Sequence, residues 1–320
     1  MIIDIPDTTT SAISKRLVLL RDEGGVIALG RVLTLVIIAN RGDEEDAIEA
    51  ANDASREHPM RVIVISVAGS QDDDDTRIDA QIRVGGDAGA SEVIILRAYG
   101  EATQNKVSLV TALLLPDAPV VAWWPGETPD DVSASPIGQI AQRRITDASA
   151  HADPHDALRH LAASHRPGDT DFAWTRLTLW RAQLAAVLDQ PPYEQITSVR
   201  VTGAADSPST TLLAAWLRLQ LNVPVTCDLT HNVGGVGGIH GVEMTRASGT
   251  ISLERPLSNI ATLEIPGQPV QDIALPRRTL RDCLAEELRR LDPDVLYGDV
   301  ITKGLALLDG EGAEPTEGVQ

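Results

Sequence analysis

Cysteine and aromatic side chains are scarce in this sequence. The 320 residues include only two Cys, five Trp, three Tyr and one Phe. Cys227 and Cys283 lie far apart and form neither a CxxC pair nor a Cys/His metal-ligand spacing. They therefore indicate reduced thiols, which are typical of a cytosolic protein, and exclude a disulfide-based fold.

Long apolar runs and excess positive charge are also lacking. No run approaches the length of a membrane-spanning helix, and the N-terminal segment MIIDIPDTTT has neither the basic nor the apolar region of a signal peptide. We therefore expect a cytoplasmic protein. The net charge of −19 and the pI near 4.7 disfavour binding to nucleic acids and to anionic membranes.

Catalytic motifs are missing as well, since neither GxxxxGK[ST] nor GxSxG occurs. Two glycine-rich segments, residues 84–92 and 232–241, each lead into a strand-like run and not into a helix, so turns are favoured over a phosphate cradle. His151 and His155 have a metal-like spacing, but Pro154 favours a helix start between them. We predict no catalytic residue, no cofactor and no metal site.

Two arginine doublets offer concentrated positive charge. Arg143-Arg144 and Arg277-Arg278 could bind an anion. Surface ion pairing is the commoner fate of such doublets, and both interpretations stay open.

Alternating helical and strand-like patterns predict an α/β protein. Apolar runs of strand length, such as RVLTLVIIA (31–39), are typical of strands buried on both faces. The sequence predicts strands over residues 31–39, 61–68, 79–86, 91–100, 119–124, 196–204, 223–229, 261–265 and 272–275, and a hairpin of two strands within residues 241–255 joined at residues 248–249. It predicts helices over residues 11–22, 44–58, 104–115, 137–149, 153–164, 171–188, 207–221 and 278–291.

The length exceeds what one hydrophobic core usually serves, which predicts two α/β domains with mixed sheets. We place the domains at residues 1–165 and 166–308, the second opened by a long helix, with a flexible acidic tail at 309–320. A strand-helix-strand-strand-strand-helix order in both halves raises the hypothesis of a duplicated unit.

The scarce aromatics concentrate in two stretches, residues 113–129 and 166–181. Trp and Arg are enriched at binding hot spots because they combine large contact area with a polar group. These stretches therefore predict a partner-binding surface, although core packing is an equally simple account of each Trp. The candidate residues are Trp123, Trp124, Arg166, Asp169, Asp171, Trp174, Arg176, Trp180 and Arg181.

Several long segments resemble one known family. They include AIEAANDASREHPMRVIVI, LLLPDAPVVAWWPGETP, RPGDTDFAWTRLTLWRAQLAAVLDQPPYE and LPRRTLRDCLAEELRRLDPDVLYGDV. In order and extent these are similar to the glucose-6-phosphate dehydrogenase assembly protein family, OpcA. The resemblance implies a non-catalytic accessory protein that binds glucose-6-phosphate dehydrogenase and promotes its assembly or activity in the oxidative pentose phosphate pathway.

Two other functions stay open at this point. The first is an enzyme or sensor that binds a sugar phosphate or a nucleotide in the α/β crevice. The second is a scaffold that holds other enzymes of the pathway.

Overall fold

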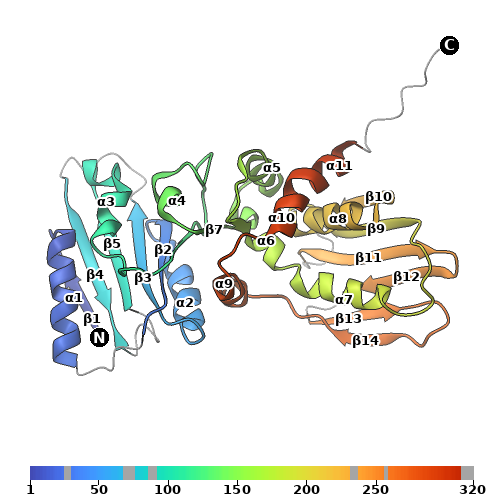
Figure 1. The fold of residues 1–320 in the computed structure, drawn as a ribbon, viewed down its shortest axis with the longest axis horizontal. Helices are drawn as coiled ribbons and strands as arrows, with labels where there is room; N and C mark the ends of the chain where they lie inside the picture. Colours follow the sequence, from blue (N-terminus) through green and yellow to red (C-terminus); the bar gives the residue numbers. More distant parts are fainter. Residues whose placement is uncertain (25–29, 68–75, 86–91, 231–236, 256–258, 311–320) are drawn as a thin grey trace, which may run out of the picture. The chain divides into compact units, whose positions relative to one another are not determined.

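The structure is a computed structural model that describes residues 1–24, 30–67, 76–85, 92–230, 237–255 and 259–310. The chain divides into two compact units (Figure 1). The first unit contains residues 1–150, 168–170 and 279–293, and the second contains residues 151–167, 171–278 and 294 onward. The boundary predicted at residues 165–166 stays a prediction. The predicted tail lies almost entirely outside the described residues.

The first unit contains an eight-stranded sheet. Its strands are β1 (Ile2–Ile5), β2 (Leu33–Asn40), β3 (Met60–Val67), β4 (Ile78–Arg83), β5 (Glu92–Ala98), β6 (Val120–Trp123), β7 (Arg143–Thr146) and β8 (Asp169–Asp171). Its helical segments are α1 (Thr10–Gly24), α2 (Glu44–Ala54), η2 (Gly100–Thr103), α3 (Lys106–Thr111), α4 (Pro136–Ile140), η3 (Ala148–Ala150) and α9 (Leu280–Arg289).

The order of this sheet is β1-β4-β5-β3-β2-β6-β7-β8. Strands β5, β3, β2, β6 and β7 run parallel, β4 is antiparallel to β5, and β1 is antiparallel to β4. From β2 the chain builds the sheet first through β3 and β5, and then returns to add β6 and β7 on the other side. This is the doubly wound arrangement, and its order reverses between β2 and β6.

The apolar character of the central strands explains their position. The first seven residues of β2, Leu33–Ala39, are all buried, as strands covered on both faces require. Helix α2 packs on β2 and β3, and α9 packs on α2 from a distant part of the sequence. The first unit therefore needs residues 280–289 to cover its crossover helix.

The second unit is built around a six-stranded sheet. Its strands are β9 (Ser198–Ala204), β10 (Val225–Thr230), β11 (Ile239–Arg246), β12 (Gly249–Glu254), β13 (Ile260–Glu264) and β14 (Gln271–Ala274). Its helical segments are α5 (Pro154–Ser164), α6 (Phe172–Thr175), α7 (Thr178–Leu188), α8 (Pro208–Leu221), α10 (Val295–Asp299), η4 (Val300–Gly304) and α11 (Leu305–Gly310).

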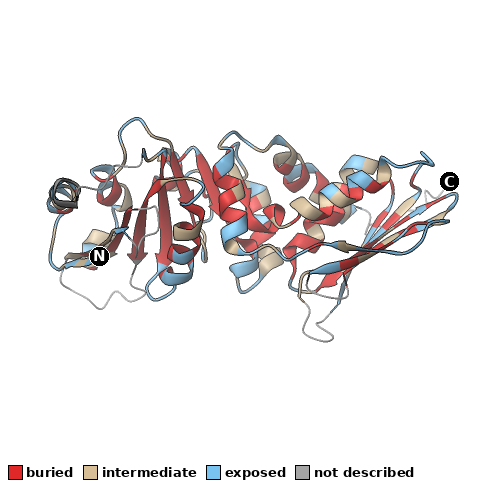
Figure 2. Ribbon diagram, turned by 90° about the horizontal axis from the view of Figure 1, so that it is seen from below, coloured by how far each residue is buried: buried red, intermediate tan, exposed pale blue. Residues whose placement is uncertain are grey.

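This second sheet has the order β10-β9-β11-β12-β13-β14. Only β10 and β9 are parallel, joined by the crossover helix α8, and the other strands are antiparallel. Ile251 and Leu253 of β12 are buried while Thr250 and Glu254 are exposed, so one face packs and the other is polar. Figure 2 shows the buried residues of this unit where its helices meet the sheet.

The α/β class with two mixed sheets is confirmed, and three details of the prediction are wrong. The two strand orders differ, which excludes a duplicated unit. Residues 137–149 do not form one helix, because Arg143–Thr146 adds strand β7 to the sheet. The single helix predicted over 171–188 is two helices, α6 and α7, and Asp171 caps the first.

Candidate functional site

A pocket of about 550 Å³ lies in the first unit at the carboxyl ends of β2 and β6. It therefore sits where the strand order reverses, which is the usual ligand position in doubly wound sheets. Asn40 and Asp43 line it from the end of β2, and the segment Trp124–Pro129 lines it from the end of β6. The volume falls in the range of small-molecule sites.

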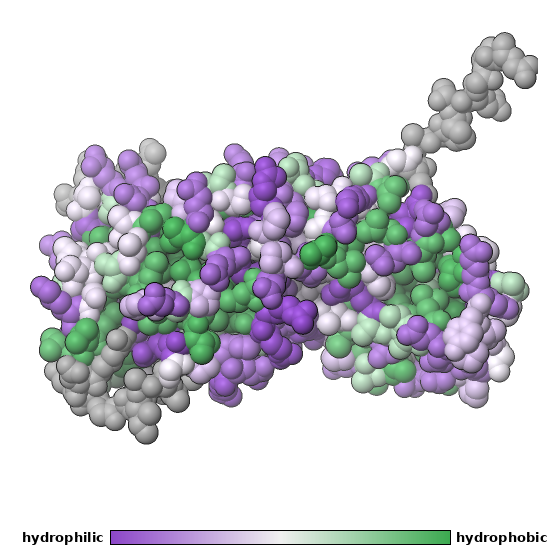
Figure 3. Space-filling model, in the orientation of Figure 1, coloured by the Kyte–Doolittle hydropathy of each residue, from purple (hydrophilic) through white to green (hydrophobic). Residues whose placement is uncertain are grey.

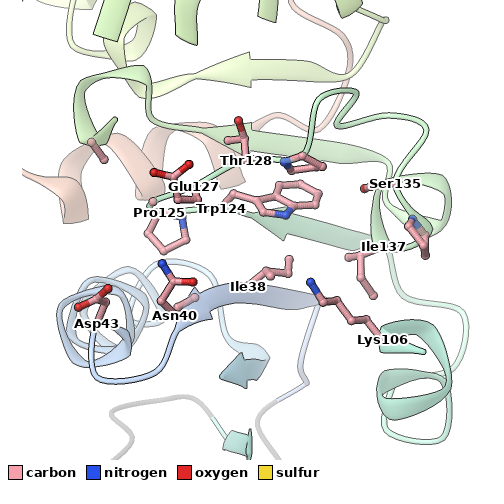
Figure 4. A pocket seen from close by; sticks show the side chains of 15 residues that line it. Ile38, Asn40, Asp43, Lys106, Trp124, Pro125, Glu127, Thr128, Ser135 and Ile137 are labelled. Atoms are coloured by element: carbon pink, nitrogen blue, oxygen red, sulfur yellow. The ribbon is translucent and has the colours of Figure 1, made fainter. Parts of the chain in front are cut away.

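Trp124 forms an apolar wall of this pocket. Its indole side chain is only 4% exposed, and its backbone N–H donates to the Ile145 carbonyl at 2.9 Å, which ties the turn to β7. Figure 4 shows the Trp124 ring and the Lys106 side chain approaching the same space, with Ile38 between them. Lys106 is the single basic side chain among the lining residues.

Acidic side chains dominate the N-terminus of the crossover helix α2. Its first turn carries Glu44, Glu45 and Asp46. The buried Glu44 carboxylate accepts a hydrogen bond from the Gly42 N–H at 2.5 Å and one from the Ser66 hydroxyl at 3.4 Å. The chain thus places its own carboxylate where the helix dipole favours an anion.

Electrostatics therefore oppose a dinucleotide in this pocket. A pyrophosphate needs a glycine-rich turn and a free helix N-terminus, whereas this turn has Gly42 alone, followed by four acidic residues. Arg83 donates two hydrogen bonds to Glu45, at 2.9 and 2.6 Å, and holds the pKa of that carboxyl below its usual range. The pocket is better suited to a neutral or cationic group than to a phosphate.

The predicted partner-binding tryptophans are all buried. The exposed fractions are 0% for Trp123, 4% for Trp124, 1% for Trp174 and 2% for Trp180. The Trp174 Nε1–H donates to the Asp294 carboxylate at 2.8 Å, and the Arg181 guanidinium lies over its ring at 3.8 Å. These rings pack within their own units, so any contribution to a docking surface must come through the residues around them.

The polar candidates are divided between structural contacts and exposed positions. Asp169 forms an ion pair with Arg144, and Asp171 caps α6 by accepting from the Ala173 N–H at 2.8 Å. Arg176 is half-buried, whereas Arg166 is exposed. The structure brings Trp174 and Arg181 together, while Trp123 and Trp124 belong to the other unit. The partner-binding role of the nine residues stays a prediction.

The Arg143-Arg144 doublet is paired with carboxylates and is buried rather than exposed. Arg143 Nε donates to Glu287 Oε2 at 3.1 Å and its Nη1 donates to the Asp292 carbonyl at 2.8 Å. Arg144 pairs with Asp169. Ion pairing of this doublet is thus confirmed. The contacts of Arg143 join β7 to residues 287–292 inside the first unit.

The strand predicted over residues 119–124 is confirmed by β6, and the segment Trp124–Pro129 at its carboxyl end lines the pocket. Sequence reasoning missed Asn40, Asp43 and Lys106, because they follow a different strand and begin a different helix. Asn40 and Asp43 had one usable signal, since Asn40 ends the apolar run that forms β2 and Asp43 follows it in the next turn. No pattern singles out Lys106.

Known structures resemble this chain only weakly. An oxidoreductase from Sinorhizobium meliloti is 8% identical with a TM-score of 0.49, and the match covers 87% of this chain and 95% of that one. An inositol dehydrogenase homolog from Azotobacter vinelandii, complexed with NADH and myo-inositol, is 10% identical with a TM-score of 0.39 and 90% coverage of both chains. These similarities carry no activity over to this chain. Comparison with curated proteins gives no match.

Family models cover most of the sequence. Residues 51–163 match the model for the N-terminal domain of the glucose-6-phosphate dehydrogenase subunit, and residues 167–301 match the model for its C-terminal domain. The two matches follow one another in the order in which the family has them. The chain belongs to the OpcA family of glucose-6-phosphate dehydrogenase assembly proteins.

Proposed function

We propose that this protein is a non-catalytic accessory protein that binds glucose-6-phosphate dehydrogenase and promotes its assembly or allosteric activation. The proposal rests on one observation, the two consecutive matches to domains named for a subunit of that dehydrogenase. Through this partner the protein would support the oxidative pentose phosphate pathway and the supply of NADPH.

The chemistry of the first unit supports a role without catalysis. The crossover helix α2 begins with the chain's own carboxylates, and a single glycine stands in the turn before it. A hydride-transferring enzyme needs a firmly held dinucleotide at this position, and these residues disfavour its pyrophosphate.

Activation of the partner would arise from differential binding. If the protein binds the active conformation or oligomer of the dehydrogenase more tightly than the inactive one, it shifts the population by that difference. An activation of roughly 5- to 150-fold requires about 1–3 kcal/mol of coupling free energy, which a few contacts at a protein interface can supply.

The exposed part of the predicted surface supplies the docking contacts in this proposal. Arg166 is exposed and precedes the buried Asp171 and Trp174 in the sequence. The viewed face of each unit carries both hydrophilic and hydrophobic areas (Figure 3). A charged contact at Arg166 would set orientation and association rate more than affinity.

An assay of the dehydrogenase from the same source tests this proposal. We expect the initial rate of glucose 6-phosphate oxidation to rise as the protein is added, with saturation at a fixed stoichiometry, and light scattering to show a complex. A rate and a mass distribution unchanged by excess protein would contradict the proposal.

Two matched charge reversals locate the docking face. Arg166→Glu should raise the concentration of protein needed for half-maximal activation, because it replaces an attractive contact by a repulsive one. Arg159→Glu is the control, since Arg159 is exposed on α5 of the same unit and pairs with the neighbouring Asp156. Equal effects of the two changes would remove Arg166 from the docking face.

The pocket at the carboxyl ends of β2 and β6 favours a second candidate function, a sensor for a small polar metabolite. Calorimetry with glucose, with glucose 6-phosphate and with NADP, on this protein alone, separates a sensor from a pure protein binder, and the acidic surroundings of the pocket favour the neutral sugar among the three. Trp124 lines the pocket, so a ligand there should change its fluorescence.

A further inference from the structure

Two arginine side chains of the second unit converge on one glycine. Gly238 has a φ of +82°, and a Cβ atom placed on it would lie 2.9 Å from Arg277 Nη1 and 3.8 Å from Arg255 Nη2. Because a side chain at position 238 would displace these guanidinium groups, glycine is what allows both of them to reach this point.

Arg255 is the more deeply placed of the two. It follows β12, is 6% exposed, and its Nη2 donates to the Ile239 carbonyl at 3.1 Å. Its guanidinium carbon lies 5.2 Å from the centre of the Trp180 ring. Its buried Nε has no hydrogen-bond partner in the described part of the chain. Arg277 is exposed, so the pair is open to solvent on that side.

The absence of a carboxylate beside this pair is unusual for the protein. The other buried arginines among the described residues each face an acidic side chain: Arg61 faces Glu92, Arg143 faces Glu287, Arg144 faces Asp169 and Arg246 faces Glu194. Within the same described residues, Arg255 and Arg277 form no ion pair. The sequence has 46 acidic residues and 27 basic ones, yet within the described part of the chain no carboxylate pairs with either of these two arginines.

Burial disfavours the charged form of both guanidinium groups. Burial lowers the pKa of Arg255 to about 10, and the positive charge of Arg277 acts in the same direction. Burial also lowers the pKa of Arg277. Both groups remain protonated at neutral pH, so the free protein carries an electrostatic cost that a bound anion would relieve. A cation–π contact with the Trp180 ring can stabilise the charge of Arg255. That contact does not explain why Arg277 lies beside it.

We propose that Arg255 and Arg277 form a binding site for a phosphate group, either inorganic phosphate or a phosphomonoester. Guanidinium groups present several N–H donors in a planar fork that matches phosphate oxygens, and two cations match a dianion. The site belongs to the second unit alone and is independent of the pocket in the first unit. It does not depend on the proposed dehydrogenase partner.

Thermal unfolding of the full chain tests the site. Sodium phosphate should raise the melting temperature relative to sodium chloride at the same ionic strength, by roughly 4 °C at a hundredfold excess over the Kd. Glycerol 3-phosphate should act in the same way. Arg277→Gln should weaken phosphate binding at least tenfold and, without phosphate, should melt no lower than the natural protein, because it removes the repulsion.

The control is Arg159→Gln, which removes an exposed arginine of the same unit that pairs with Asp156 and should leave the phosphate effect unchanged. An Arg277→Gln protein that binds phosphate as tightly as the natural one would overturn the site. Equal stabilisation by acetate and by phosphate would overturn the assignment to phosphate. Because the chain is measured alone, neither result bears on activation of the dehydrogenase.

Discussion

Trp174 is held on several sides inside the second unit. Asp294 accepts from its indole N–H at 2.8 Å, Arg181 lies over its ring at 3.8 Å, and the Tyr297 ring centre is 5.9 Å away. Such a side chain fills volume that no neighbour can take over. The sequence could mark Trp174 as important, but it could not distinguish core packing from partner binding, and the burial of the side chain shows that it packs in the core.

We predict that Trp174→Ala lowers the free energy of unfolding by about 3–5 kcal/mol, because it leaves a cavity and removes the indole donor of Asp294. Trp174→Phe keeps most of the volume and should cost less. Urea unfolding followed by circular dichroism measures both. A Trp174→Ala protein with an unchanged midpoint but reduced activation of the dehydrogenase would instead favour a direct docking role.

Cys227 should react slowly in the folded protein. Burial raises the pKa of its thiol to about 11, with a further contribution from the neighbouring Asp228 carboxylate, and thiols react as thiolates. We expect alkylation by iodoacetamide at pH 7.5 to be on the order of a hundredfold slower than in urea, and to accelerate as the pH approaches 11. Labelling followed by mass spectrometry of the Cys227 peptide gives both rates. Equal rates in the native and unfolded protein would contradict the partial burial of this thiol.

The same raised pKa predicts a pH dependence of stability. The thiol stays protonated in the native protein while the unfolded chain begins to release its proton near pH 9. This contribution to stability is therefore fully present below pH 9 and is lost as the pH rises toward 11.

At the scale of elements, periodicity predicted most helices and strands but could not assign short segments held by distant partners. Residues 143–146 sit in an apolar and basic stretch that fits a helix as well as a strand. They form β7 because the edge of β6 is available and because Arg143 meets Glu287, 144 positions along the chain. The break between α6 and α7 has no glycine or proline to mark it.

The contact between β7 and α9 yields a test at this scale. Glu287→Ala should lower the free energy of unfolding by about 3–5 kcal/mol, because it leaves the buried Arg143 without its counter-charge. Glu286→Ala is the matched control on the same helix, since Glu286 lies outside the buried residues of α9. Thermal unfolding of both variants measures the two losses of stability. Similar losses would show that the buried ion pair contributes no more to stability than Glu286 does.

At the scale of the whole molecule, the first unit is built from distant parts of the sequence. Helix α9 packs on α2, His58 Nε2 lies 3.1 Å from the Ala285 carbonyl, and Arg289 pairs with Glu57 at 3.1 Å. In the described residues no helix is both long and apolar enough to cross a membrane. The sequence predicted two α/β bodies, but nothing in it marks residues 279–293 as part of the first, since their pattern is that of any amphipathic helix.

A truncated chain tests this arrangement. Residues 1–165 produced alone should be poorly soluble or should melt well below the full chain, because the face of α2 that packs on α9 is uncovered and Arg143 has lost Glu287. Adding a synthetic peptide of residues 279–293 should raise the melting temperature. If the fragment alone melts like the full chain, the domain boundary at residue 165 would be a true folding boundary.

The return of α9 to the first unit sets an order of events during synthesis. A ribosome adds about 5–20 residues per second, so roughly 7–29 s pass between the appearance of Arg143 and that of Glu287, which lies 144 residues later. During this interval most of the second unit is synthesised. In the first unit Arg143 still lacks Glu287, and the face of α2 that packs on α9 is uncovered. We therefore expect the nascent chain to need chaperones most before residues 279–293 have been synthesised.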